Sequence, residues 1–289
     1  MKQVTAKVIK NEQTLLGLQR PHAGTFKRPD ARNILGSRII WLSCPEIVWE
    51  AKPGQFVMVC CRGGCLLPRP FSIHQVNDKG DMALWFAVWK GGKGTIWLSR
   101  CQEGDTVELF GPLGNGFSVH PASHKLLLVA GGIGIAPLYF LAQQALNHGH
   151  KVKLLRGASG EFKPSGEPNP TQHYPEGLLP RGIELETITS SSDGQTGMVL
   201  ELLTPEVVDW ADQIFACGPM AMYRHIAAQS EQLLRGKPIQ VSLEVRMGCG
   251  LGVCYGCTVK TKSGQKQVCR DGPVFDLDDI LWDKLAEII

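Results

Sequence analysis

The sequence lacks an excess of charge of either sign. Its 289 residues include 30 Lys and Arg and 27 Asp and Glu, a formal net charge of +3, without a block of basic residues. Binding to nucleic acid or to an anionic membrane by electrostatics requires such a patch, so neither partner is expected. With 43% hydrophobic and 20% charged residues, the chain can form packed cores. This composition excludes a disordered, collagenous or coiled-coil protein.

An apolar leader is also missing from the N-terminus, which reads MKQVTAKVIKNEQ. We therefore expect a cytoplasmic protein, whose ten cysteines are thiols or metal ligands rather than disulfides. Residues 126–146 form an uncharged run of 21 residues, close to the ~20 that span a bilayer. Three glycines and a proline near its centre indicate instead a strand, a turn and the start of a helix, so no membrane segment is expected.

The pattern of apolar segments changes twice along the chain. Closely spaced strands separated by Gly and Pro turns predict an antiparallel barrel or sandwich in residues 1–118. Alternating strands and helices in 119–237 predict a parallel sheet with helices on its faces. The remainder, 238–289, is too small to be stable without a cross-link or a metal. The expected strands are 4–10, 38–44, 55–61, 83–89, 106–114, 125–132, 151–158, 183–190, 213–218 and 239–245, and the expected helices are 136–149, 198–211 and 219–236.

Four cysteines cluster in the last of these parts. Their spacing, C-x4-C-x2-C-x11-C, fits the plant-type [2Fe–2S] pattern, in which four thiolates hold two irons. The four are Cys249, Cys254, Cys257 and Cys269. Interleaved glycines let such a loop curl tightly and bring its N–H groups close to the sulfur atoms. These glycines are Gly248, Gly250, Gly252 and Gly256.

Two other interpretations of the cluster remain. A zinc site usually takes two C-x2-C pairs, and only Cys254 and Cys257 have that spacing here. Unconnected buried thiols are the third possibility. The spacing and the glycines favour the iron–sulfur cluster.

Two strand–turn–helix segments predict a nucleotide site. In GGIGIAP, a strand that ends at Ala130 is followed by Gly131, Gly132 and Gly134 and then by a helix. The N–H groups at the start of a helix suit a pyrophosphate, although G-x-G-x-x-G, the dinucleotide fingerprint, is not present. FACGP repeats the arrangement at residues 215–219, and both turns follow the carboxyl ends of strands, where ligands bind in a parallel sheet.

The second turn contains Cys217 and Gly218. Cys217 at this position could lie beside a nicotinamide ring. A buried thiol that only packs is the alternative.

The predicted barrel carries a candidate phosphate site. In LPRPFSI, two prolines hold Arg69 extended, so that its guanidinium can bind a phosphate with help from the Ser72 hydroxyl. The backbone of Lys93-Gly94-Thr95 could donate to the same anion. Each segment alone also fits an ordinary strand edge or turn.

The motifs RPFS, KGT, GGIGIAP, CGP and the final cysteines occur in one order. This order resembles the electron-transfer subunits of two-subunit, NAD-linked bacterial dihydroorotate dehydrogenases, which belong to the ferredoxin–NADP reductase superfamily. The resemblance begins at about residue 36, and its most specific part is LEVRMGCGLGVCYGCTV with VCRDGPVF. It implies a multidomain β and α/β fold: an N-terminal antiparallel FAD-binding barrel, a Rossmann-like parallel-sheet nucleotide domain and a small C-terminal [2Fe–2S] domain.

The resemblance also implies which residues bind the cofactors, while it assigns no catalytic residue. For FAD they are Arg69, Pro70, Phe71, Ser72, Val88, Gly94 and Thr95. For NAD they are Gly131, Gly132, Gly134, Cys217 and Gly218. For the cluster they are the four cysteines named above.

The chain departs from the family at three places. Residues 20–36 resemble an insertion, Val88-Trp89-Lys90 replaces the aromatic–Arg pair that is often found there, and the loop 157–182 is longer than usual.

The cofactor set predicts the chemistry. NADH gives two electrons as a hydride and a [2Fe–2S] cluster takes one at a time, so a flavin is needed between them. The resemblance implies an FMN-containing catalytic subunit as partner in a hetero-oligomer, a heterotetramer. Electrons from dihydroorotate would pass through the cluster and FAD to NAD⁺ in de novo pyrimidine (UMP) biosynthesis, and this chain would not itself oxidise dihydroorotate. The alternatives are a hydrogenase or sulfide dehydrogenase subunit and, in another class, a zinc-stapled nucleotide-binding regulator.

Overall fold

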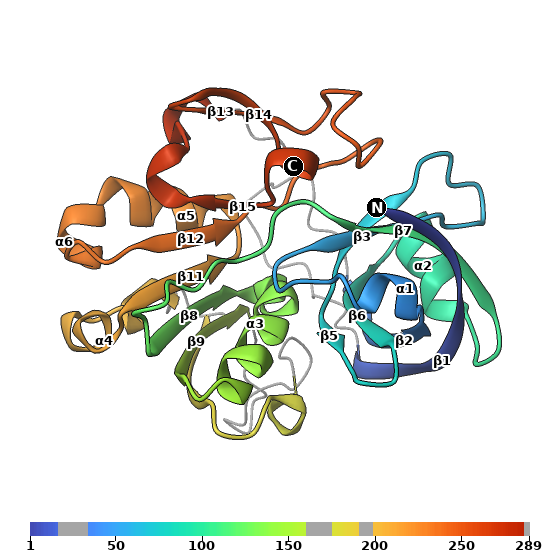
Figure 1. Ribbon diagram of the computed structural model, residues 1–289, viewed down its shortest axis with the longest axis horizontal. Coiled ribbons are helices and arrows are strands. Elements are labelled where there is room, and N and C mark those ends of the chain that lie inside the picture. The colour runs from blue at the N-terminus through green and yellow to red at the C-terminus, as the bar shows by residue number, and fades with distance from the viewer. Residues whose placement is uncertain (17–33, 160–174, 191–198, 286–289) are drawn as a thin grey trace, which may run out of the picture.

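The computed structural model describes residues 1–16, 34–159, 175–190 and 199–285 (Figure 1). They form a seven-stranded, a six-stranded and a two-stranded sheet. Most of the predicted insertion at 20–36 and most of the loop 157–182 lie outside the described residues.

The N-terminal sheet is antiparallel throughout and curls into a half-barrel. Its order is β4-β3-β7-β1-β2-β6-β5. The strands are β1 (Lys2–Leu16), β2 (Ile34–Ser43), β3 (Phe56–Val59), β4 (Arg69–Ser72), β5 (Gln75–Val76), β6 (Asp81–Trp89) and β7 (Thr106–Leu113), with the short helices α1 (Pro45–Val48) and α2 (Lys93–Arg100). Burial alternates along β7, as expected where one face of a sheet covers a core. The predicted antiparallel β fold is thereby confirmed, although β1 is longer than expected and residues 93–95 begin a helix.

The second sheet has the order β10-β9-β8-β11-β12-β15, and its strands are parallel except for the last. The strands are β8 (Lys125–Gly131), β9 (Lys151–Ser159), β10 (Glu184–Ser190), β11 (Gln213–Cys217), β12 (Ile239–Ser242) and β15 (Val274–Asp276). Leu126 and Leu128 pack in one core with α3 (Ile135–Asn147), whereas Leu127 and Val129 pack in another with α4 (Pro205–Trp210) and α5 (Met220–Ala228). Helices on both faces explain why the strand interiors are buried throughout. The predicted parallel-sheet domain is confirmed.

Two predicted helices are each divided in the structure. The segment 198–211 becomes the 3₁₀ helix η4 (Val199–Leu202) and α4, because Thr204 caps a new helix by accepting from the Val207 N–H and Pro205 occupies its first turn. The segment 219–236 is interrupted at Gln229 between α5 and α6 (Ser230–Leu234).

The C-terminal part contains the hairpin of β13 (Thr258–Thr261) and β14 (Gly264–Gln267), then α7 (Val268–Asp271). The chain next enters β15, which pairs antiparallel with β12, and ends in η5 (Leu277–Asp279) and η6 (Trp282–Lys284). Both β12 and β15 follow residue 238 and yet extend the six-stranded sheet. The exact domain boundaries remain a prediction.

The half-barrel and the C-terminal part share one hydrophobic core. Phe56, Met58 and Leu113 of the half-barrel belong to the same buried cluster as Cys257 and Cys269. A Cβ atom at Gly250 would lie 2.6 Å from the Met58 Cγ atom, so the backbone of the cysteine loop lies directly on β3. Among the described helices, none is long and apolar enough to cross a bilayer.

We expect Gly134→Ala to destabilise the six-stranded sheet. A Cβ atom there would overlap the Cys217 carbonyl, and forcing extra volume into a packed site costs about 1–3 kcal/mol. Thermal unfolding followed by circular dichroism measures the change. Gly177→Ala is the control, because no atom lies within 4 Å of its added methyl group. Equal unfolding temperatures for the two variants would contradict the close contact.

Candidate functional site

A first cavity, of about 530 Å³, lies between β4 and the start of α2. Residues 69–71 line one side, and Trp89 together with residues 90–95 lines the other. The cationic side chains are Arg69, Lys90 and Lys93. Cations beside the N-terminus of a helix form a setting that suits a phosphate.

Gly94 lets α2 approach Arg69 closely. A Cβ atom at Gly94 would lie 3.0 Å from the Arg69 Cγ atom and 3.2 Å from the Cys61 Sγ atom. The Arg69 Nη1 atom donates to the Leu67 carbonyl at 2.9 Å and to the Pro68 carbonyl at 3.3 Å, which restrains the guanidinium. The Thr95 hydroxyl donates to the Gly92 carbonyl at 3.2 Å. Arg69, Pro70, Phe71, Gly94 and Thr95 are thus brought together around one cavity.

Two of the residues predicted to bind FAD do not line this first cavity. Ser72 lines a second cavity, described below, and does not line the first. Val88 is buried and lines a separate cavity between β2 and α2. Trp89 and Lys90, which follow it, line the first cavity instead. Successive strand side chains point to opposite faces, which accounts for the difference between Val88 and Trp89.

The two predicted nucleotide turns lie against each other at the carboxyl edge of the parallel sheet. A Cβ atom at Gly131 would lie 3.3 Å from the Gly218 Cα atom, and one at Gly134 would overlap the Cys217 carbonyl. Gly132 has a φ of +57°, with open space where a side chain would be. The lack of side chains here is what lets the ends of β8 and β11 meet.

The second cavity, of about 180 Å³, lies where the half-barrel, the parallel sheet and the cysteine segment meet. It is lined by Phe56, Pro70, Ser72, Cys217, Ser242, Leu243, Glu244, Val245, Met247 and Pro273. Cys217 is completely buried, and burial raises the pKa of its thiol well above the ordinary value, so it is neutral at pH 7.

The sequence analysis missed Glu244. Its side chain lines the second cavity and is exposed there, and desolvation by the protein atoms around the carboxyl raises its pKa to about 6. An ionisable residue near the end of a predicted apolar strand was the available signal; in the structure it lies two residues beyond Ser242, the last residue of β12. Glu244 lines a cavity together with Ser72 and Cys217, which come from distant parts of the chain, so its place there could not be predicted from its own segment.

The four cysteines form two pairs in space. The thiol of Cys249 interacts with that of Cys254, and the thiol of Cys269 interacts with that of Cys257. The Cys269 N–H donates to the Cys257 Sγ atom at 3.5 Å, and the Gly252 N–H donates to the Cys269 Sγ atom at 3.1 Å. The loop N–H groups therefore point at sulfur, as expected where thiolates need stabilisation.

The electrostatics differ between the pairs. Although burial opposes ionisation, N–H donors of Leu251, Cys254 and Val253 lower the pKa of the Cys249 thiol. Burial, followed by the neighbouring Cys257 thiol, raises the pKa of Cys269. Two adjacent buried thiolates repel each other, so both can be ionised only beside a cation.

The arrangement of the thiols in two pairs suits a two-iron cluster. A structural zinc site takes all four ligands on one ion. Two thiol pairs match the two irons of a [2Fe–2S] centre, each of which takes two protein ligands.

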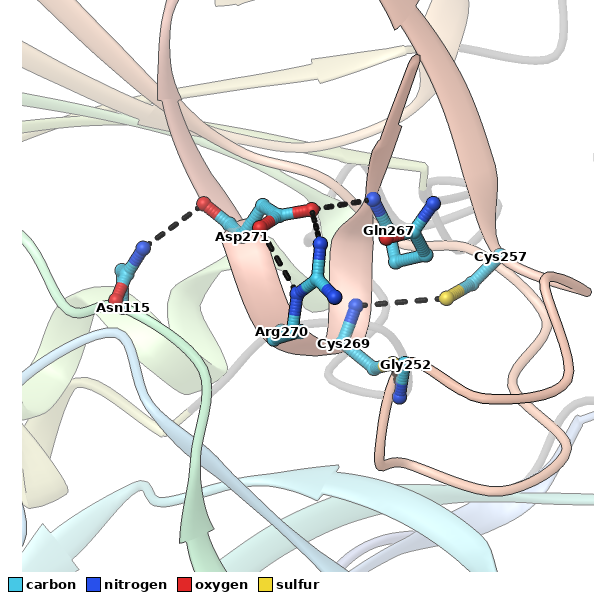
Figure 2. A network of polar contacts seen from close by, with 7 residues as sticks. All are labelled: Asn115, Gly252, Cys257, Gln267, Cys269, Arg270 and Asp271. Carbon is cyan, nitrogen blue, oxygen red and sulfur yellow. Dashed lines mark hydrogen bonds and ion pairs between the residues drawn. The ribbon is translucent and has the colours of Figure 1, made fainter.

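A polar network fixes the segment that carries Cys269 (Figure 2). The Asp271 carboxylate accepts from the Gln267 N–H at 2.7 Å and pairs with Arg270. The Asn115 side chain, at the end of the half-barrel, donates to the Asp271 carbonyl at 2.9 Å. The position of Cys269 is thereby tied to the half-barrel.

The pairs also differ in exposure. Cys257 and Cys269 are 2% and 1% exposed and face the core shared with the half-barrel. Cys249 is half-buried and Cys254 is exposed. An electron carrier held there would have a protected side toward the half-barrel and an open side toward solvent.

Two family models match the chain. Residues 40–117 match an oxidoreductase FAD-binding domain, and residues 244–281 match the iron–sulfur cluster binding domain of dihydroorotate dehydrogenase B. FAD and an iron–sulfur cluster are therefore the cofactors of these domains. The second match includes all four clustered cysteines.

Solved and curated proteins resemble the chain over most of its length. One solved structure is that of an NADH-dependent reduced ferredoxin–NADP oxidoreductase, described for flavin-based electron bifurcation. It superposes with a TM-score of 0.76. It is 25% identical, and the match covers 99% of this chain and 92% of that one. The electron transfer subunit of dihydroorotate dehydrogenase B (NAD⁺) from Caldanaerobacter subterraneus subsp. tengcongensis is 36% identical, with 86% of this chain and 97% of the relative covered.

The subunit of the same name from Desulforamulus reducens is 38% identical, with 83% of this chain and 90% of the relative covered. The chain belongs to the family of dihydroorotate dehydrogenase B electron transfer subunits.

Proposed function

We propose that this chain carries electrons from a dihydroorotate-oxidising catalytic subunit, which contains FMN, to NAD⁺ through a [2Fe–2S] cluster and FAD. The observation that carries the proposal is the meeting of three parts at the second cavity: the end of β4, the Cys217 turn and the segment that leads into the cysteine loop. The names of the relatives supply the substrate and NAD⁺, and favour dihydroorotate over hydrogen or sulfide.

Cys249 and Cys254 would hold one iron, and Cys257 and Cys269 the other. The pairing of the thiols and the N–H groups directed at them support this assignment. The buried pair would face FAD and the exposed pair the partner, because the first adjoins the half-barrel core and the second adjoins solvent.

Arg69, with the start of α2 at Gly94 and Thr95, would bind the FAD diphosphate in the first cavity. Lys90 and Lys93 add positive charge beside it. Pro70 lines both cavities and Ser72 lines the second. β4 would thus lead from the phosphates to the flavin ring.

Gly131, Gly132, Gly134 and Gly218 would admit the NAD phosphates close to the backbone, and Cys217 would contact the nicotinamide. A bound flavin exchanges a hydride with NAD(H) and single electrons with a cluster. The neutral thiol of Cys217 and the apolar walls of the second cavity would exclude water from that exchange. Such a chain would work in the cytoplasm within a hetero-oligomer, a heterotetramer with its catalytic subunit, in pyrimidine biosynthesis.

Anaerobic titration of the purified chain with NADH tests this function. We expect flavin and iron–sulfur absorption bands, both bleached by NADH, and no turnover of dihydroorotate until the catalytic subunit is added. A colourless protein, or oxidation of dihydroorotate by this chain alone, would contradict the proposal.

We expect Cys254→Ser to remove the cluster colour and lower the iron content while FAD is retained, because one iron loses a thiolate. Iron analysis and the visible spectrum measure the two cofactors separately. Cys101→Ser is the control, since Cys101 lies at the end of α2 in a half-barrel core that contains none of the four clustered cysteines. Iron content unchanged by Cys254→Ser would show the ligand assignment to be wrong.

Arg69→Gln should weaken FAD binding at least about tenfold, because a hydrogen bond to a charged group contributes about 1.5–3 kcal/mol. FAD affinity is measured by adding FAD back to deflavinated protein. Arg62→Gln provides the comparison: Arg62 lies in the connection that leads from β3 to β4, its side chain is 65% exposed, and it pairs with Glu108 at 3.4 Å. Equal losses in both variants would rule out a specific phosphate contact.

The raised pKa of Glu244 predicts that the stability of the fold depends on pH. Its pKa is about 6 in the folded chain against an ordinary value of 4.5, so the folded state binds the proton more tightly. The carboxyl therefore destabilises the fold only when it is charged: the effect is absent below about pH 4.5, grows as the pH rises through 6 and is then constant.

Between pH 5 and 7.5, the unfolding temperature of Glu244→Gln should accordingly rise relative to the unmodified protein and then level off. Glu231→Gln, at an exposed position on α6, controls for the loss of a carboxylate. A difference for Glu244→Gln that does not vary with pH would contradict the raised pKa of this carboxyl.

A further inference from the structure

Tyr223 connects the two strand ends that border the second cavity. Its side chain, only 1% exposed, extends from the first turns of α5 back toward the sheet. The hydroxyl accepts a hydrogen bond from the Gly218 N–H at 2.8 Å and donates one to the Ser242 carbonyl at 2.6 Å. It also interacts with the Cys217 thiol.

The hydroxyl occupies the point where two paired strands separate. β11 and β12 run in parallel as far as the pair Cys217 and Ser242. Beyond it, one chain turns through Gly218 into α5, while the other continues to Glu244 at the cavity. Backbone groups at such a divergence lose their ladder partners, and a tyrosine hydroxyl, which both donates and accepts, can satisfy one of each kind.

The ring is held as firmly as the hydroxyl. It packs against Trp282 at 5.5 Å between centroids, and the Trp282 indole donates to the Leu277 carbonyl at 2.9 Å. The next residue, Arg224, donates to the Leu285 carbonyl. The C-terminal segment thus packs over this part of α5 and restrains the Tyr223 side chain.

We propose that Tyr223 is a positioning residue for the pyridine nucleotide. Its hydroxyl sets the distance between the Cys217–Gly218 turn and the strand end at Ser242–Glu244, and so keeps the second cavity open to the nicotinamide end of NAD. The inference rests on the proposed function, which places the nucleotide at this turn. Tyr223 itself lies behind the turn, and acts on the nucleotide through Gly218 and Ser242.

Tyr223→Phe removes the hydroxyl and keeps the ring. Without it, the buried Gly218 N–H and Ser242 carbonyl lose their shared partner, and the turn must shift to pair them. We expect NAD⁺ binding to the oxidised, FAD- and cluster-loaded chain to weaken about tenfold, a change within the usual effect of an unpaired buried group. Calorimetric titration with NAD⁺ measures it, and the KM for NADH should rise more than kcat falls.

Two controls separate positioning from a general loss of stability. Thr204→Ala removes the N-cap of α4, which packs in the same core as α5. We expect it to lower the unfolding temperature and to leave NAD⁺ affinity unchanged. FAD content and the cluster spectrum should be unaltered in both variants. If Tyr223→Phe does not accumulate as folded protein, Trp282→Phe, which loosens the packing of the ring, must weaken NAD⁺ binding in the same direction.

Normal NAD⁺ affinity in Tyr223→Phe, or weakening equal to that of Thr204→Ala, would overturn the role of Tyr223. Failure of the unmodified chain to bind NAD⁺ would instead overturn the proposed nucleotide site itself. The two failures are therefore distinguishable.

Discussion

Cys257 and Cys269 lie side by side in a buried hydrophobic core, and this contact constrains much of the C-terminal structure. Two buried thiolates cannot stay ionised together unless positive charge lies beside them. The loop from residue 248 to 256 supplies N–H dipoles to the sulfur atoms, and α7 places Cys269 where one such N–H reaches it. The metal centre is thus both the electron carrier and the cross-link that a segment of this size needs for stability.

Other contacts hold the cysteine loop and the Cys269 segment against the half-barrel. The segment carrying Cys269 is held by Asn115 at the end of the half-barrel, and Gly250 lies on Met58. The returning chain then adds β15 to the nucleotide sheet beside β12. The cysteine loop, the cavity proposed for FAD and the turns proposed for NAD therefore share supporting elements, which favours fixed distances between the redox groups over independently moving domains.

Features set by local chemistry were predictable from the sequence. The cysteine spacing and the glycines of the two turns are properties of short segments, and the structure brings Gly131 to Gly218 as parallel strands require. The start of α4 could also have been predicted, because Thr204 is a favourable N-cap and Pro205 suits the first turn of a helix. Glu244 and Tyr223 were not predictable, because their roles arise only where distant segments converge. The role of Val88 stays a prediction: it lines a different cavity from Trp89, because neighbouring residues of a strand face opposite sides.

The central claim is that four thiols hold two irons in two pairs. Mössbauer spectroscopy of ⁵⁷Fe-enriched protein, with analysis of iron, sulfide and zinc, tests it most directly. The account predicts two irons and two acid-labile sulfides per chain, with both irons in tetrahedral sulfur coordination. One zinc ion per chain, without iron or sulfide, would contradict it.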